Sequence, residues 1–382
     1  MRKGSMVKMI RTVRGKLLWP ALLPGVLAFV LFNGSATAQT VNQLPPPPPV
    51  PKLKPTPTPK PPETGELDVV RVTSNLVMVP VSVTDQQGQA VQGLKVEDFR
   101  LEEEGRQQQI TALGDPEQVP LDIAVLFDIS SSTSQKNFFA FQQSSAAAFL
   151  KQVMKPVDKA AVFGIAGQPM LILPLAPTEV AAARILSIPP AAAQVPTAFY
   201  DTVVAAAKYL TENSPGNHRR VIIVLSDGDD NFSERTKELS LAEFRAKEKG
   251  ALPASGTLAG LQTQHRMAVQ YVQQAVQKAD AIFYSVNPGG PSVHMNVIST
   301  RSQNGMKTVA DATGGTAFLP DSDKDLEKVF RQVAAELRGQ YLLQYYGNSE
   351  APAGQFRRIQ VATPARGDLK IRARQGYYVK KQ

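Results

Sequence analysis

Oxygen-bearing side chains follow two long apolar runs of this 382-residue chain, at a spacing that suits a hard cation. The run LDIAVLF is followed by Asp128, and the hydroxyls of Ser130 and Ser132 come next at alternate positions. A second run, RRVIIVLS, is followed by Asp227, and Thr197 lies between the two runs. Hard divalent cations bind oxygen ligands, and a few hydroxyls with two carboxylates leave coordination positions open for an acidic group of a partner.

Each part of this pattern also has an ordinary structural explanation. An Asp before serines at a strand–helix junction is often a helix N-cap, and Asp-Gly after a strand is often a turn. The order of the three segments, two of them at or after buried runs, favours a metal site over these separate explanations. Three further acids lie nearby, and we expect them to support the ligands from behind or to belong to the loops: Asp201, Asp229 and Asp230.

Strand and helix patterns alternate between residues 120 and 339, which predicts a doubly wound α/β domain with a mostly parallel, six-stranded sheet. The expected strands are 122–128, 160–166, 170–175, 220–227, 281–287 and 316–320. The expected helices are 134–155, 200–210, 265–279 and 324–338. Ligands of such sheets bind at the carboxyl ends of strands where the strand order reverses, which suits Asp128 and Asp227.

A long polar connection follows the second apolar run, at residues 229–264. It contains a possible short helix at 241–249 and would lie beside the metal site. Connections of this length inside a compact domain are often functional. We therefore expect either a loop that selects the partner or a plain insertion.

Both flanks of the α/β domain have the short, alternating patterns of β-strands. Residues 66–118 include a hairpin expected to turn at Gly105, and residues 340–382 hold three more strand candidates. We predict that the two flanks pair into one β-sandwich-like region, with the α/β domain inserted between them. One strand carries a stripe of cations on one face, which is either solvated or binds acidic polymers: Lys370, Arg372 and Arg374.

The first 65 residues are expected to be a signal peptide (1–38) and a proline-rich disordered linker (39–65). The apolar run at 17–32 follows six basic residues and precedes an A-x-A site, so cleavage before Gln39 is predicted. An uncleaved membrane anchor is the alternative, but the run is shorter than the ~20 residues a spanning helix needs. Eleven prolines at positions 45–62 predict an extended spacer, or else a PxxP ligand.

Composition excludes several classes of function. There is no cysteine, so thiolate zinc sites, disulfides and cysteine nucleophiles are excluded. Six of the 42 basic residues lie in the first 38 positions, which hold no acid, so the remaining 36 face 33 acids. No aromatic-interleaved basic motif is present, so no nucleic-acid partner is expected.

The metal pattern resembles the metal-ion-dependent adhesion site (MIDAS) of von Willebrand factor type A (VWFA) domains. That signature is DxSxS, a later Thr and a later Asp, and its matches here are Asp128, Ser130, Ser132, Thr197 and Asp227. The resemblance covers roughly 120–340 and implies that both aspartates reach the ion partly through water. The flanks at 81–110 and 372–379 resemble an exported bacterial VWFA-related subfamily.

The resemblance implies an exported, non-enzymatic binding or adhesion protein, located in the periplasm, at the outer envelope surface or outside the cell. Its partner would be a protein or surface polymer engaged through Mg²⁺ or Mn²⁺, with Ca²⁺ possible, and no membrane span would remain after cleavage. An envelope scaffold with a structural metal is the alternative. A hydrolase using Ser130 or Ser132 is the third hypothesis, although no GxSxG, HExxH or P-loop motif is present. The histidines are scattered: His218, His265 and His294.

Overall fold

A computed structural model describes residues 75–129, 139–190, 195–238, 255–288 and 297–380 except residue 349, together with the isolated residues 241, 242 and 245. The expected signal peptide and linker, Ser130, Ser132 and His294 lie outside the described residues. So do the start of the helix expected from residue 134 and most of the helix expected at 241–249.

A six-stranded sheet forms the centre of the α/β domain, in the order β10-β9-β8-β5-β6-β7. All neighbouring strands are parallel except β7, which runs antiparallel to β6 at the edge. The strands are β5 (Leu121–Asp128), β6 (Lys159–Ile165), β7 (Met170–Ala176), β8 (Arg219–Leu225), β9 (Ala281–Val286) and β10 (Ala317–Phe318). The residues of β5, β8 and β9 are buried throughout because helices cover both faces. The predicted doubly wound, mostly parallel sheet is confirmed.

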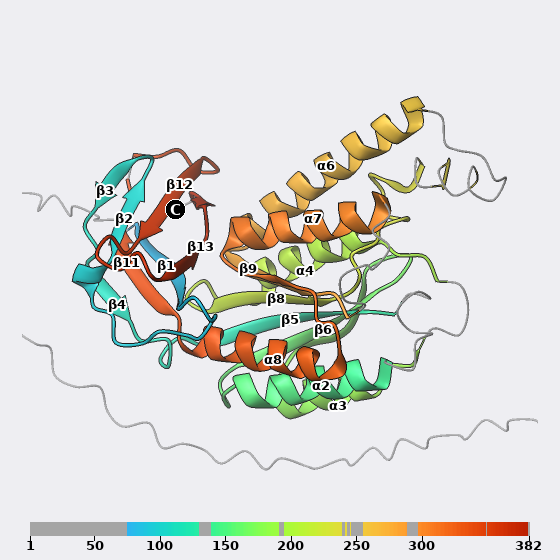
Figure 1. Ribbon diagram of the computed structural model, residues 1–382, viewed down its shortest axis with the longest axis horizontal. Coiled ribbons are helices and arrows are strands. Elements are labelled where there is room, and N and C mark those ends of the chain that lie inside the picture. The colour runs from blue at the N-terminus through green and yellow to red at the C-terminus, as the bar shows by residue number, and fades with distance from the viewer. Residues whose placement is uncertain are drawn as a thin grey trace, which may run out of the picture. The chain divides into compact units, whose positions relative to one another are not determined.

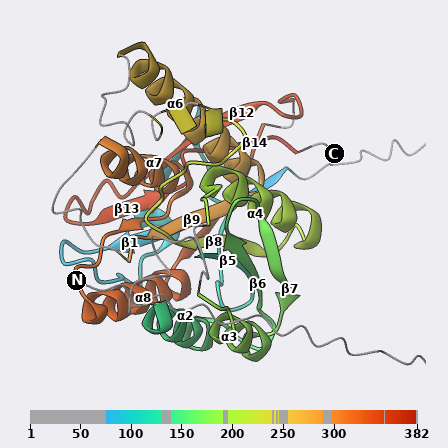
Figure 2. The same ribbon diagram turned by 90° about the vertical axis from the view of Figure 1, so that its right-hand side faces the viewer.

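Helices cover the sheet in two groups of three (Figures 1 and 2). One face packs against α2 (Phe139–Val153), α3 (Thr178–Leu186) and α8 (Asp323–Arg338). The other packs against α4 (Phe199–Asn213), α6 (Ser255–Lys278) and α7 (Val297–Thr313). The prediction missed α3 and α7. It also began α6 too late: the helix starts at Ser255, within the stretch interpreted as a loop up to residue 264.

The β-rich flanking region consists of two four-stranded antiparallel sheets, β13-β1-β11-β4 and β14-β12-β2-β3. Its elements are β1 (Leu76–Thr84), the 3-10 turn η1 (Val96–Asp98), β2 (Arg100–Glu103), β3 (Arg106–Gln108), β4 (Ala112–Gly114), β11 (Tyr341–Tyr346), β12 (Phe356–Ala362), β13 (Lys370–Ala373) and β14 (Gly376–Tyr378). Strands from both ends of the chain pair in each sheet and share one apolar core, as the fold prediction stated. The β2–β3 hairpin turns at Glu104 and Gly105, whose φ angles are 50° and 75°, as a two-residue hairpin requires.

The cationic stripe of β13 and the residue after it is not the solvated face that the sequence favoured. Only Lys370 is exposed. The Arg372 guanidinium lies 2.6 Å from the carboxylate of Glu336 on α8, and Arg374 forms an ion pair with Asp280 before β9. The alternation along the strand therefore exists, but two of its three cations face the α/β domain and join the two regions.

Candidate metal site

The two candidate aspartates lie at the carboxyl edge of the sheet, on either side of its topological switch point. From β5 the chain proceeds to β6 on one side and later returns to β8 on the other. Asp128 is the last residue of β5, and Asp227 follows β8 by two residues. The Ser226 hydroxyl joins the two strand ends, donating to Asp128 Oδ2 at 2.6 Å and accepting the Gly228 N–H at 2.9 Å. This is the crevice in which open α/β sheets bind ligands.

Thr197 is fixed at the same edge by its backbone. Its N–H donates to Asn231 Oδ1 at 2.8 Å, and its carbonyl accepts the N–H groups of Asn231 and Phe232 at 3.0 Å each. The next residue, Ala198, donates its N–H to the carbonyl of Ala166, just after β6, at 2.7 Å. Thr197 is buried, and within the described part of the chain its hydroxyl has no hydrogen-bond partner. The backbone contacts thus position a hydroxyl that remains available as a ligand.

The turn that carries Asp227 packs against α7. Gly228 has a φ of +78°, and a Cβ at this position would lie 2.7 Å from the terminal methyl of Met306. One helical turn earlier, the Ser302 hydroxyl donates to Asp229 Oδ1 at 2.7 Å. Asp227 itself is half-buried and accepts the Asp229 N–H at 3.2 Å. The helix therefore holds the turn that presents Asp227.

Asp229 lies in an electrostatically unfavourable position for a carboxylate. Burial and the neighbouring charge of Asp227 raise its pKa, while the Ser302 hydroxyl and the charge of Arg301 lower it, and the pKa settles at about 6. Burial and the nearby charge of Asp227 therefore both disfavour the ionised form of Asp229.

Asp230 and Asp201 hold the polar segment after β8 against the start of α4. Buried Asp230 accepts hydrogen bonds from the Ser233 hydroxyl at 2.5 Å, the Thr236 hydroxyl and the Tyr200 N–H at 3.1 Å. Burial raises the pKa of Asp230, and these hydrogen bonds oppose the rise. Asp201 accepts the Glu234 N–H at 2.9 Å. Both acids thus support the loop.

Five polar residues of the site were not identified from the sequence: Ser226, Asn231, Ser233, Thr236 and Ser302. Four of them lie in the run SDGDDNFSERT, in which Asp, Asn, Ser and Thr recur at the short spacings of side-chain-to-backbone turns. That pattern could have indicated a self-supporting loop. Ser302 lies on α7, a helix that was not predicted, and its contact with Asp229 depends on tertiary packing.

The described histidines take part in contacts away from Asp128 and Asp227. The His218 ring lies with Nδ1 2.9 Å from Asp122 Oδ2, at the amino end of β5. His265 Nδ1 lies 3.1 Å from the Tyr200 hydroxyl, and burial followed by the charge of Arg301 lowers its pKa to about 3. Among the described residues, no group of three or more His, Cys, Asp or Glu side chains could hold a metal.

No protein-family model and no curated protein matches the chain. Solved structures with a similar arrangement include BatB from Bacteroides thetaiotaomicron, at 12% identity and a TM-score of 0.37, with 56% of this chain and 97% of that chain covered. The vWF domain of the pilus tip protein Mfa5 from Porphyromonas gingivalis gives 11% identity, a TM-score of 0.38 and coverages of 56% and 94%.

A third similar structure is proximal thread matrix protein 1 from the mussel byssus, with a zinc-occupied MIDAS motif. It gives 16% identity and a TM-score of 0.38, and the match covers 62% of this chain and 49% of that one. The strand order of the α/β domain, with its antiparallel edge strand and three helices on each face, is the doubly wound fold that the resemblance to VWFA domains predicted.

In the part of the chain that the structure describes, no helix is long and apolar enough to cross a membrane.

Proposed function

We propose that this protein is an exported, non-enzymatic binding protein that engages its partner through a divalent cation. The cation would be held by Asp128, Ser130, Ser132, Thr197 and Asp227. The main support is the position of Asp128 and Asp227 on either side of the switch point, with the Thr197 backbone tied to the same loop.

The residues at this edge fit a hard cation. Ser226 orients the carboxylate of Asp128, Asp227 is half-buried and reaches solvent, and the Thr197 hydroxyl has no protein partner in the described residues. All are oxygen donors, which favours Mg²⁺ or Mn²⁺, and also Ca²⁺, over softer metals. The bound ion would supply a positive centre with open coordination positions, one of which takes an acidic group of the partner.

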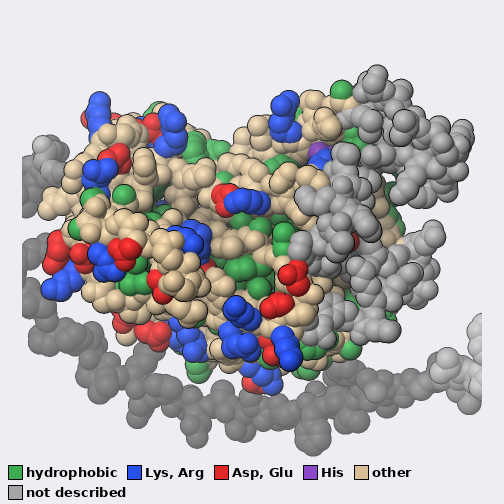
Figure 3. Space-filling view, in the orientation of Figure 1, with side chains coloured by type: hydrophobic (Ala, Val, Ile, Leu, Met, Phe, Trp, Pro, Cys, Tyr) green, Lys and Arg blue, Asp and Glu red, His purple; other side chains and the backbone are tan. Residues whose placement is uncertain are grey.

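The partner is proposed to be a protein or a surface polymer rather than a nucleic acid. On the face shown in Figure 3, acidic and basic side chains of the described residues are interspersed, whereas nucleic-acid sites are uniformly basic. The leader at 1–38 and the spacer at 39–65 support export and display away from a surface. The protein is proposed to keep no membrane span after cleavage.

The loop contacts favour adhesion over a scaffold with a purely structural metal. Asp230 and Asp201 already hold the segment after β8 through contacts with Ser233, Thr236 and Glu234. A loop that is satisfied by its own hydrogen bonds does not require a cation in order to fold. The metal would then serve the partner contact.

Thermal unfolding of the protein with EDTA, Mg²⁺, Mn²⁺ or Ca²⁺ tests the proposal. An ion at 10–100 times its Kd adds about 1.4–2.7 kcal/mol, which corresponds to a rise in Tm of roughly 3–10 °C. Thr197→Val should abolish the rise and keep the fold, since the backbone contacts of Thr197 remain. Thr211→Val, which removes a hydroxyl bonded within α4, is the matched control and should retain the rise.

The outcomes separate the hypotheses. No rise with any ion rejects the metal site, and an equal rise in Thr197→Val rejects the ligand assignment. If EDTA alone unfolds the protein, the scaffold hypothesis is preferred. Partner binding is then tested with Mn²⁺-loaded protein, in which a glutamate-containing peptide should displace metal-bound water and reduce water-proton relaxation.

A further inference from the structure

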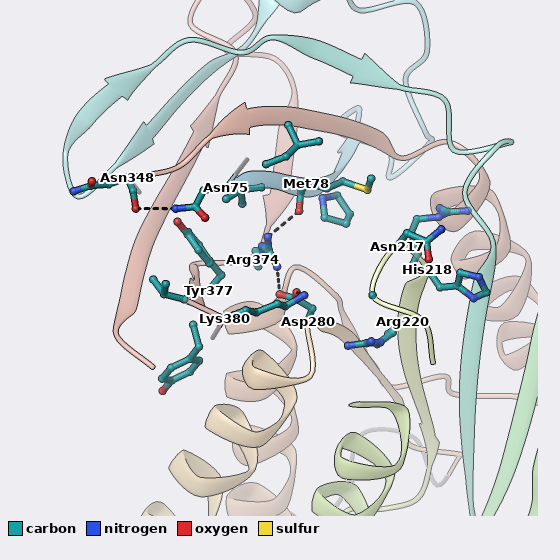
Figure 4. Close-up of a pocket in the computed structure, with 17 residues that line it drawn as sticks. Asn75, Met78, Asn217, His218, Arg220, Asp280, Asn348, Arg374, Tyr377 and Lys380 are labelled. Atoms are coloured by element: carbon teal, nitrogen blue, oxygen red, sulfur yellow. Dashed lines mark hydrogen bonds and ion pairs between the residues drawn. The ribbon is translucent and has the colours of Figure 1, made fainter. Parts of the chain in front are cut away.

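A cavity of about 480 Å³ lies at the end of the sheet opposite the candidate metal site, between the β-rich region and the α/β domain (Figure 4). The beginnings of β1 and β8, the residue before β9 and the C-terminal segment line it. Its volume is within the range of about 300–1,000 Å³ that small-molecule sites occupy. One wall is apolar, and its members include Leu76, Val77, Met78, Pro80 and Val379.

The polar wall of the cavity contains more positive than negative charge. The carboxylate of Asp280 contacts two cations: it forms an ion pair with Arg374 and lies 2.5 Å from the ammonium of Lys380. Arg374 also donates to the carbonyl of Met78 at 2.8 Å, which fixes its guanidinium. The side chain of Lys380 is 60% exposed, so its ammonium can exchange one anion for another.

Arg220 adds a buried charge that no carboxylate of the described residues contacts directly. Its guanidinium donates to the carbonyls of Ala279 and Ser214 at 2.9 and 2.7 Å, and the residue is 6% exposed. The Nε atoms of Arg220 and Arg374 are buried without hydrogen-bond partners in the described structure. Carbonyl dipoles contact this buried cation directly, and the charges of Asp280 and Asp122 act on it only from beyond contact distance, so the approach of an anion is still favoured.

We propose that this cavity binds a small organic anion. Its carboxylate, sulfonate or phosphate would lie toward Lys380 and Arg220, and its apolar or aromatic body would pack against Met78, Pro80 and Tyr377. The labelled side chains in Figure 4 show the cationic groups and Tyr377 around the same space. The apolar wall favours an organic anion over inorganic phosphate, because only a ligand with an apolar body can cover this wall and remove its surface from water.

A fluorescence titration with 8-anilinonaphthalene-1-sulfonate tests the proposal, with its uncharged analogue N-phenyl-1-naphthylamine beside it. The sulfonate should bind the folded protein with a single saturable Kd, unchanged by EDTA because the candidate metal site is at the other end of the sheet. Lys380→Gln should weaken binding about tenfold, the effect of one charge-assisted hydrogen bond. Arg358→Gln, an exposed cation on β12 outside the cavity, is the matched control and should leave the Kd unchanged.

A second variant locates the probe. Gly216 lines the cavity, and a Cβ there would meet no atom within 4 Å, so Gly216→Trp can fill the space and should block binding. Unchanged affinity in both Lys380→Gln and Gly216→Trp overturns the proposal, and so does equally tight binding of the uncharged analogue. Because the titration does not depend on metal, its failure would leave the proposed function standing.

Discussion

Carboxylates at the two ends of the central sheet are stabilised in different ways. At the amino end, Asp280 is half-buried, and the charges of Arg374 and Lys380 outweigh the effect of that burial and hold its pKa below the usual value. At the carboxyl end, burial raises the pKa of Asp230, and the hydrogen bonds that oppose this rise come from hydroxyls and backbone N–H groups. Asp280 is thus neutralised by protein cations, whereas Asp230 is oriented by neutral donors.

This difference indicates what each end can do. An ion pair within the protein cancels charge and joins the elements that carry the two partners, as Arg372 and Glu336 join β13 to α8. Acids held by neutral groups retain their negative field, which an external cation can balance. The amino end is therefore suited to connecting the two regions, and the carboxyl end to binding a metal.

The largest expected effect comes from breaking an ion pair between the two regions. Arg372→Met would leave Glu336, which is 2% exposed, as an uncompensated buried charge. The free energy of unfolding should fall by about 3–5 kcal/mol, measured by urea denaturation. Lys370→Met, an exposed cation on the same strand, should change it by less than about 0.5 kcal/mol. Equal effects of the two variants would show that the pair does not join the regions.

The turn at the carboxyl end should be sensitive to a single methyl group. Gly228→Ala would strain a φ of +78° and place its Cβ against Met306, costing about 2–3 kcal/mol. Gly354→Ala has a similar φ of +81° but open space around it, so only about 1 kcal/mol is expected. Chemical denaturation gives both values, and equal losses would mean that α7 does not restrain the turn.

His265 should make the stability of the α/β domain depend on pH. Its pKa is about 3 in the folded protein, against an ordinary value of 6.5 in an unfolded chain, so the unfolded chain binds the proton more readily. The contribution of neutral His265 to the free energy of unfolding is complete above pH 6.5 and is lost as the pH falls toward 3. The loss is about 1.4 kcal/mol per pH unit, or roughly 2 kcal/mol at pH 5. His265→Gln should remove this dependence, which unfolding curves at pH 7 and pH 5 would measure. Parallel losses in both proteins would contradict it.

The smallest expected effect concerns the orientation of Asp128. Ser226→Ala removes the 2.6 Å hydrogen bond to Asp128 and should cost about 1 kcal/mol of stability. It should also raise the metal concentration at which half of the Tm increase occurs, because the carboxylate is no longer held in place. Ser144→Ala, which removes a hydroxyl bonded within α2, should leave that concentration unchanged. If Ser226→Ala leaves the metal concentration at half of the Tm increase unchanged, Ser226 does not orient a metal ligand.

Much of the site's frame could be predicted from local patterns. Long apolar runs before Asp128 and Asp227 indicated buried parallel strands, and strand ends must converge at one edge of such a sheet. The ligand assignment itself stays a proposal. Helix α7 was not predicted because its apolar residues are few and interspersed with polar ones, so the contacts of Ser302 and Met306 with the turn were missed as well.

The sequence by itself determined the alternation of strands and helices, the strand patterns in both flanks, and the cationic stripe along one strand. These depend on local periodicity, which decides which residues share a face. Tertiary structure alone decided that Arg372 faces buried Glu336 and Arg374 faces half-buried Asp280. It also decided that Asp230 supports a loop and that a cationic cavity forms beside Asp280. Periodicity specifies a face but not its partner, and burial, ion pairs and pKa shifts depend on which distant surfaces meet.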